Sequence, residues 1–346
     1  MNEKIFIGII ALNEKDLNQT IKSAIANAYN PERLKFGISI QSFNKSFHNF
    51  DNINADITCV EMYHPAPIGV GANRLFSTLL NDNSCDFYLQ VDAHMLFEKN
   101  WDKDLIYYYN KINEKYSKPV ISTYVPFWYE ENNEIKLCIN KNIQVDPYNF
   151  SSGFKKNVKL KIDDFEEGLP RKYPKITGED VSWQNNKEYE EHYLTSGHFL
   201  FTTIDYVYNI MQDPFFGFGP EELTLGIRLW TRGYNIFTIN KPIVWHKNKQ
   251  GDNLDPNDWR ISSNVPDQKL NDIFYDKLYI GYSRAKDIFL GDEVGYWGAT
   301  SQDSLAEYVY TTGYNFNEYY DMLKERMIKN NNILGLKSMY GIDNSI

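Results

Sequence analysis

An aspartate and a histidine, two residues apart, end an apolar segment in the first third of the chain. Residues 88–94 read Tyr-Leu-Gln-Val-Asp-Ala-His, so Asp92 and His94 stand where the segment turns polar. Side chains at positions i and i+2 of a strand point the same way. A carboxylate oxygen and an imidazole nitrogen together suit a borderline divalent cation such as Mn²⁺. A polar turn would explain the same residues, so the pair alone leaves a turn and a metal site open.

A third candidate ligand follows a second apolar segment. His246 comes directly after Asn-Lys-Pro-Ile-Val-Trp at 240–245. Open α/β sheets bind their ligands at the carboxyl ends of the strands. Two histidines and one aspartate at such ends form a three-ligand set that leaves coordination positions for a substrate phosphate. The alternative for His246 is a histidine that is satisfied within the protein or exposed to solvent.

The elements that would position these residues alternate between strand and helix. Segment 4–12 is apolar and β-branched, which is typical of a strand buried on both faces. Leu17, Ile21, Ala24, Ile25 and Ala28 share one face of the helix expected after it. The other expected strands are 34–43, 56–64, 85–94 and 118–129, and the other expected helices are 69–82 and 100–116. This alternation predicts an α/β fold with a mostly parallel central sheet.

The second half of the chain is less regular. Residues 130–190 are rich in Asn, Lys, Glu and Asp, and we expect a variable insertion or extended strands there, near the site. Regular structure returns at 193–211, and 219–239 predicts a helix, a stop at Gly233 and a strand. We therefore expect a catalytic domain over 1–250. Residues 251–346 would begin with a linker and form a helical extension packed on that domain.

Composition narrows the class of protein. Of 346 residues, 42% are hydrophobic and 24% charged, which is typical of a folded globular protein. The net charge of −10 disfavours nonspecific binding to nucleic acid. Cys59, Cys85 and Cys138 form no Cys-x-x-Cys pair, which argues against a zinc–thiolate site and a disulfide framework. No segment approaches the roughly 18 apolar residues of a membrane span. We therefore expect a cytoplasmic protein without a membrane span.

Taken in order, the motifs resemble a known family of enzymes. They are GVGANRLFSTLL from 69, the segment ending in DAH, SGHFLF from 196, and GPEELTLGIRLWTRGYNIFTINKPIVWH from 219. This order resembles the GT-A glycosyltransferases, which have a Rossmann-like fold, and among them the polypeptide GalNAc-transferases. The chain is more similar to the cytoplasmic UDP-GlcNAc:polypeptide/hydroxyproline α-GlcNAc-transferases, whose tail pattern resembles residues 283–316. Gly-Pro-Glu-Glu stands where the GalNAc-transferases have Gly-Gly-Glu-Asn, which leaves the donor sugar open.

The resemblance implies a role for each candidate residue. Asp92, His94 and His246 would hold Mn²⁺ or Mg²⁺ on the diphosphate of a UDP-sugar. Glu221 and Glu222 would contact the sugar hydroxyls or the acceptor, although acids also favour the first turn of any helix. The residues implied in binding the donor nucleotide and sugar are Ala11, Asn13, Glu14, Arg74, Gly197 and His198. Asn13 could equally begin a helix, and Arg74 could form a surface ion pair.

The activity implied by the resemblance is a retaining transfer of GlcNAc from UDP-GlcNAc. The acceptor would be a hydroxyl of protein Ser, Thr or hydroxyproline, or of a glycan. The insertion at 130–190 would lie on the acceptor side of the site, and Trp128 would floor the acceptor site. One alternative is a phage-type enzyme that glycosylates hydroxymethylated pyrimidines in DNA; the acidic net charge disfavours it, and a basic groove formed by the lysine-rich stretch at 155–175 would favour it. A second alternative is a non-catalytic module that binds a nucleotide sugar. A third, a nucleotidyltransferase, would need further metal carboxylates and a Gly-rich signature with lysine.

Overall fold

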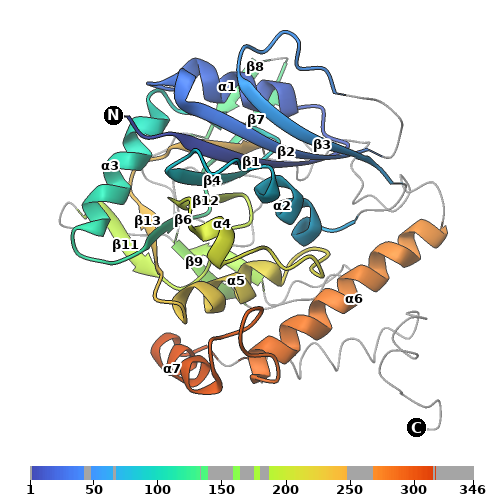
Figure 1. The fold of residues 1–346 in the computed structure, drawn as a ribbon, viewed down its shortest axis with the longest axis vertical. Coiled ribbons are helices and arrows are strands. Elements are labelled where there is room, and N and C mark those ends of the chain that lie inside the picture. The colour runs from blue at the N-terminus through green and yellow to red at the C-terminus, as the bar shows by residue number, and fades with distance from the viewer. Residues whose placement is uncertain are drawn as a thin grey trace.

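The structure, a computed structural model, describes most of the chain around one large sheet (Figure 1). The described residues are 2–42, 48–64, 68–132, 134–138, 159–163, 175–179, 187–247, 268–314 and 316. The eight strands of the central sheet are, in spatial order, β11 (Tyr189–His192), β13 (Asn235–Ile239), β6 (Pro119–Ser122), β12 (Phe199–Thr203), β4 (Phe87–Asp92), β1 (Ile5–Leu12), β2 (Leu34–Ser42) and β3 (Asp56–Tyr63).

The pairing within this sheet confirms a mixed α/β architecture. Among the described strands, four of the seven neighbouring pairs are parallel: β1–β2, β1–β4, β2–β3 and β6–β13. The strands β12 and β11 pair only in the antiparallel sense. The parallel strands β1 and β4 both run toward the edge at which Asp92 lies, so the sheet delivers a carboxylate to one end, as the sequence predicts.

Helices cover both faces of the sheet. They are α1 (Leu17–Asn27), α2 (Val70–Leu79), α3 (Trp101–Asn113), α4 (Tyr206–Asn209), α5 (Glu221–Trp230), α6 (Gln268–Leu290) and α7 (Gln302–Thr312), with a short 3₁₀ turn at Pro31–Arg33. On β1, Ile5, Ile7 and Ile9 share a core with α1 and α3, whereas Phe6 faces the opposite core beside α4 and α5. The face predicted for α1 is confirmed, because all five of its members lie in or against the first core.

A second, smaller sheet carries one of the candidate ligands. Its order is β5 (Met95–Phe97), β14 (Val244–Lys247), β7 (Phe127–Glu131) and β8 (Glu134–Leu137). The single strand predicted over 118–129 is wrong, since β6 and β7 belong to different sheets. Pro126 stands between them, and it cannot donate a backbone hydrogen bond to a ladder. His246 lies inside β14 instead of after a strand, opposite Met95 of β5.

The C-terminal helices pack on α5. Figure 1 shows α5, α6 and α7 together at one end of the molecule. They share an apolar cluster that includes Leu223, Ile288 and Tyr308. Arg228 of α5 donates to the Met211 carbonyl oxygen at 2.8 Å and lies against the Trp297 ring. The expected linker at 251–260 and the tail beyond residue 316 lie outside the described residues.

The segment expected as an insertion is only partly described. Between 139 and 186 the structure describes an antiparallel pair, β9 (Lys159–Asp163) with β10 (Lys175–Glu179). Extended strands were one of the two forms predicted for 130–190, and the acceptor-side placement stays a prediction. In the part of the chain that the structure describes, no helix is long and apolar enough to cross a membrane.

Candidate functional site

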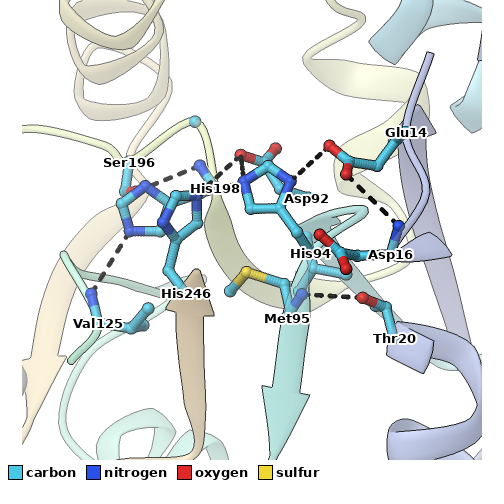
Figure 2. A network of polar contacts seen from close by, with 12 residues as sticks. Glu14, Asp16, Thr20, Asp92, His94, Met95, Val125, Ser196, His198 and His246 are labelled. Carbon is cyan, nitrogen blue, oxygen red and sulfur yellow. Dashed lines mark hydrogen bonds and ion pairs between the residues drawn. The ribbon is translucent and has the colours of Figure 1, made fainter. Parts of the chain in front are cut away.

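Three ligand-type atoms from two sheets converge at the end of β4. Asp92 is the last residue of β4, His94 follows in the turn before β5, and His246 comes from β14. The Nε2 atoms of the two histidines are 2.9 Å apart. Oδ2 of Asp92 lies 3.4 Å from Nε2 of His246 and 3.9 Å from Nε2 of His94. Figure 2 shows the three side chains pointing toward one another. The set predicted from the sequence is therefore assembled in space.

This donor set fits a divalent cation. Neighbouring ligands of an octahedral ion are about 3 Å apart and opposite ligands about 4 Å, given metal–oxygen distances of about 2.1 Å. The three separations fall in that range, and all of the candidate atoms lie within 4.8 Å of one another. Two imidazole nitrogens and one carboxylate oxygen suit Mn²⁺ or a related ion. Three protein ligands leave positions for substrate oxygens.

Arg74 holds the carboxylate of this set. Its Nη2 donates to Oδ1 of Asp92 at 2.5 Å and to the Gly197 carbonyl oxygen at 2.6 Å, and its Nη1 donates to the Val91 carbonyl oxygen at 2.8 Å. Burial alone would raise the pKa of Asp92, but the hydrogen bond from His246 and the charge of Arg74 keep it well below its usual value. Asp92 therefore stays ionised, with Oδ2 turned toward the histidines. The nucleotide contact predicted for Arg74 stays a prediction.

Three further groups fix His94. A carboxylate oxygen of Glu14 lies 3.0 Å from its Nδ1. Its carbonyl oxygen accepts from the Trp128 indole N–H at 3.1 Å and from the Lys247 amide at 3.0 Å. Trp128 is fully buried, so it lies beneath His94 and does not floor an acceptor site as the sequence suggested. Glu14, predicted as a donor-binding residue, lies against the candidate ligand His94.

His198 forms a wall beside the ligand set. Its ring centroid lies 4.7 Å from that of His246 and 5.0 Å from that of Tyr124. Burial, followed by the nearby charge of His246, lowers the pKa of His198 well below its usual range, so the ring is neutral. A neutral imidazole carries no positive charge, so it suits packing against a ligand better than binding a phosphate. The sequence predicted His198 but missed Tyr124, for which it carries no local signal.

The glutamate pair begins α5 close to Gly197. Glu222 accepts hydrogen bonds from the Gly197 amide at 2.5 Å and from the Tyr124 hydroxyl at 3.2 Å. The buried Oε2 atom of Glu221 has no hydrogen-bond partner in the described part of the structure. Burial raises the pKa of both carboxyls, and the charge of Glu221 raises that of Glu222 further. The two carboxyls therefore differ. Glu222 is held by two hydrogen bonds, whereas Glu221 has an oxygen that can still accept a hydrogen bond.

The raised pKa of Glu221 gives a pH-dependent stability. Because the folded protein holds this proton more tightly than the unfolded chain, the free energy of unfolding falls as pH rises from the ordinary value of 4.5 toward the raised value of about 7. Glu221→Gln cannot titrate, so we expect it to lose part of this fall and to melt several degrees above the wild type at pH 8. Thermal melts at pH 5 and pH 8 measure this, with exposed Glu307→Gln as the control. A variant that follows the wild-type pH curve would contradict it.

The remaining residues predicted to bind the sugar donor lie near the carboxyl end of β1. Ala11 is buried in the core and offers no free side chain. Asn13 adopts a left-handed conformation with φ of 49°, and its amide donates to the Gln41 carbonyl oxygen at 2.8 Å. It therefore makes a turn after β1 and does not cap α1, which begins at Leu17.

The glycine-rich start of α2 serves packing. The amides of Val70 and Gly71 donate to the carbonyl oxygens of Gly217 and Phe216 at 2.8 and 3.0 Å. A Cβ at Gly71 would lie 2.0 Å from the Asp213 carbonyl oxygen, so only glycine allows this approach. These amides are therefore occupied by backbone, and they anchor the helix that carries Arg74.

Comparisons with known proteins show the family and the fold. A family model described as "Glycosyltransferase (GlcNAc)" matches residues 51–272. A crystal structure of GalNAc-T7 with UDP, GalNAc and Mn²⁺ is similar with a TM-score of 0.55 and 11% sequence identity, over 95% of this chain and 58% of that chain. The chain thus spans little more than half the length of that neighbour, and at this identity the likeness shows the fold, which is the GT-A fold. No curated protein sequence matches the chain.

Proposed function

The chain belongs to the GlcNAc glycosyltransferase family, and we propose that it transfers GlcNAc from UDP-GlcNAc to a hydroxyl group with retention of configuration. The proposed acceptors are Ser, Thr or hydroxyproline of a protein, or a glycan. Their common chemistry is a neutral hydroxyl nucleophile. All three cysteines are free, which supports a reducing, cytoplasmic location as part of the proposal.

The observation that carries the proposal is the convergence of Asp92, His94 and His246 on one point. A GT-A enzyme has to stabilise a leaving nucleoside diphosphate. When bound there, Mn²⁺ or Mg²⁺ would neutralise the negative charge that develops on the diphosphate. A site built from two imidazoles and one carboxylate supplies a single negative charge, so a bound divalent cation keeps a net positive charge for the diphosphate.

The chain's own residues hold the reacting groups in place. Arg74 occupies Oδ1 of Asp92 and leaves Oδ2 directed at the histidines. Glu222 binds the Gly197 amide and so fixes the segment that would lie under the donor sugar. The Oε2 atom of Glu221 has no described partner, and we propose that it accepts a hydrogen bond from a hydroxyl of the donor sugar or of the acceptor substrate.

Retention of configuration is proposed to proceed on one face of the sugar. Asp92 and Glu222 are both held by hydrogen bonds, and Glu221 is given the role of binding a hydroxyl, so no carboxylate is assigned as a nucleophile. The acceptor hydroxyl would form the new bond to the anomeric carbon as the bond to the diphosphate breaks. Its proton would pass to the departing phosphate oxygen. Rate enhancement then comes from positioning and electrostatic stabilisation.

The test of the proposed function is turnover of the donor without an acceptor. Purified protein would be incubated with a panel of UDP-, GDP- and TDP-sugars, with and without Mn²⁺, and the released nucleotide measured. We expect slow hydrolysis of UDP-GlcNAc that requires the metal. Hydrolysis of another UDP-sugar would change the proposed donor. If no sugar in the panel releases nucleotide, and UDP with Mn²⁺ causes no thermal shift, the interpretation as a non-catalytic binding module would be favoured.

The acceptor class is decided by adding acceptors to the same assay. Peptides containing Ser, Thr or hydroxyproline are expected to accelerate release of UDP. DNA that contains hydroxymethylated pyrimidines tests the alternative acceptor. The side chains of the lysine-rich stretch at 155–175, whose arrangement as a basic groove would favour that alternative, lie outside what the structure describes.

A further inference from the structure

A four-residue loop after β1 places two acids against the two segments that carry the metal histidines. The loop is Asn13-Glu14-Lys15-Asp16, between β1 and α1. Its entry is fixed by the turn at Asn13, and its exit by the Asp16 carbonyl oxygen, which accepts from the Thr20 amide at 2.9 Å. Both ends are therefore tied to regular structure, so the acids between them have defined positions.

Glu14 contacts the His94 ring. Its Oε2 lies 3.0 Å from Nδ1, and the side chains are only 10% and 14% exposed. An imidazole that donates Nδ1–H to a carboxylate keeps the lone pair of Nε2 free for a metal. Nε2 is the atom that faces His246 and Asp92. Figure 2 shows Glu14 on one side of the His94 ring, with the ligand set beyond the other nitrogen.

Asp16 addresses the strand of His246. Both of its carboxylate oxygens lie 3.0 Å from Nζ of Lys247, the residue directly after His246. The side chains of this ion pair are 7% and 9% exposed. The Lys247 amide in turn donates to the His94 carbonyl oxygen at 3.0 Å. Lys247 thus connects three parts: its ammonium group pairs with Asp16 of the loop, its backbone belongs to β14, and its amide binds the backbone of His94.

Resting on the metal site of the proposed function, we propose that loop 13–16 is the positioning element of that site. Glu14 orients the ring of His94, and Asp16 holds β14 in place through Lys247. The Nε2 atoms of His94 and His246 are therefore as close to each other as two ligands of one metal ion before the metal binds. A carboxylate or other partner behind a metal-binding histidine typically changes metal affinity about 10–100-fold. This assigns Glu14 to the metal, and not to the nucleotide as the sequence resemblance implied.

The experiment measures Mn²⁺ affinity by electron paramagnetic resonance, without any nucleotide. Glu14→Ala is expected to weaken Mn²⁺ binding about 10–100-fold, and Glu14→Gln, which keeps an oxygen acceptor for Nδ1–H, to weaken it less. Asp16→Asn is expected to weaken it as well. If that variant does not fold, Asp16→Asn combined with Lys247→Gln removes both charges of the pair. Glu130→Gln is the matched control, because Glu130 also contacts Lys247, at 3.4 Å, but its side chain is 48% exposed.

A second readout separates positioning from general stability. In the metal-free protein, long-range ¹H–¹⁵N spectra are expected to show His94 as the Nδ1–H tautomer, and Glu14→Ala to populate the other tautomer. Wild-type Mn²⁺ affinity in Glu14→Ala, with weaker UDP binding, would overturn the inference and return Glu14 to the nucleotide. Absence of Mn²⁺ binding by the wild type itself would instead overturn the metal site, and the inference with it.

Discussion

Replacement of His246 by alanine is expected to lower metal-dependent turnover of the donor by about a thousandfold or more. The variant removes one of the three proposed protein ligands while Asp92 and His94 keep their other partners. Stabilisation of a leaving diphosphate by a metal is worth several kcal/mol, and each 1.36 kcal/mol is about a factor of ten in rate. His246 lies on a short strand between β5 and β7, so its backbone pairing survives the change.

The measurement compares donor hydrolysis by the wild type and His246→Ala across Mn²⁺ concentrations. The melting temperature of the metal-free protein is the control, and we expect it to change by only a few degrees. A rise in the Mn²⁺ concentration needed for half-maximal activity would accompany the loss of rate. Wild-type turnover in the variant at low Mn²⁺ would remove His246 from the ligand set.

Replacement of Arg74 by methionine is expected to destabilise the metal-free protein by about 3–5 kcal/mol. The guanidinium side chain is 5% exposed and that of Asp92 is 24% exposed, so the variant leaves a shielded carboxylate without its counter-charge. Breaking a buried pair by removing one partner costs about that much. The variant also leaves the carbonyl oxygens of Val91 and Gly197 without this donor. Mn²⁺ affinity is expected to fall as well, because Oδ2 of Asp92 is no longer held.

Chemical unfolding in denaturant measures this loss, with Arg33→Met as the matched control. Arg33 makes an ion pair at 3.8 Å with Glu32, whose side chain is 68% exposed, and exposed pairs contribute about 0–1 kcal/mol. A loss below about 1 kcal/mol in Arg74→Met, together with a large loss of UDP affinity, would support the nucleotide role predicted from the sequence and contradict the role drawn from the structure.

Local patterns predicted the elements that carry the site. The apolar run at 4–12 and the spacing of Leu17, Ile21 and Ala24 follow from burial of one strand and one helix face, and these appear as expected. The strand at 118–129 failed because periodicity does not show that a chain leaves one sheet and enters another. Pro126 was the available signal for that break.

The candidate ligands were predicted because metal chemistry restricts residue type, and Asp92 lies at a strand end as expected, whereas His246 reaches the site from inside β14 of the second sheet. The supports of these ligands were not predicted, since these depend on contacts between distant parts of the chain. Arg74 meets the Gly197 carbonyl across 123 positions, and Lys247 meets Asp16 across 231. Neither spacing has a local signature. Tyr124 was missed for the same reason, because its contact with Glu222 arises only when β6 and α5 are brought together.

The measurement that tests the account most directly is anomalous diffraction from crystals soaked with Mn²⁺ and UDP. The account predicts one strong manganese peak within bonding distance of Oδ2 of Asp92 and Nε2 of both His94 and His246, with oxygens of the UDP diphosphate completing the coordination. UDP bound with no manganese at these three atoms, or manganese bound elsewhere with the diphosphate, would contradict it.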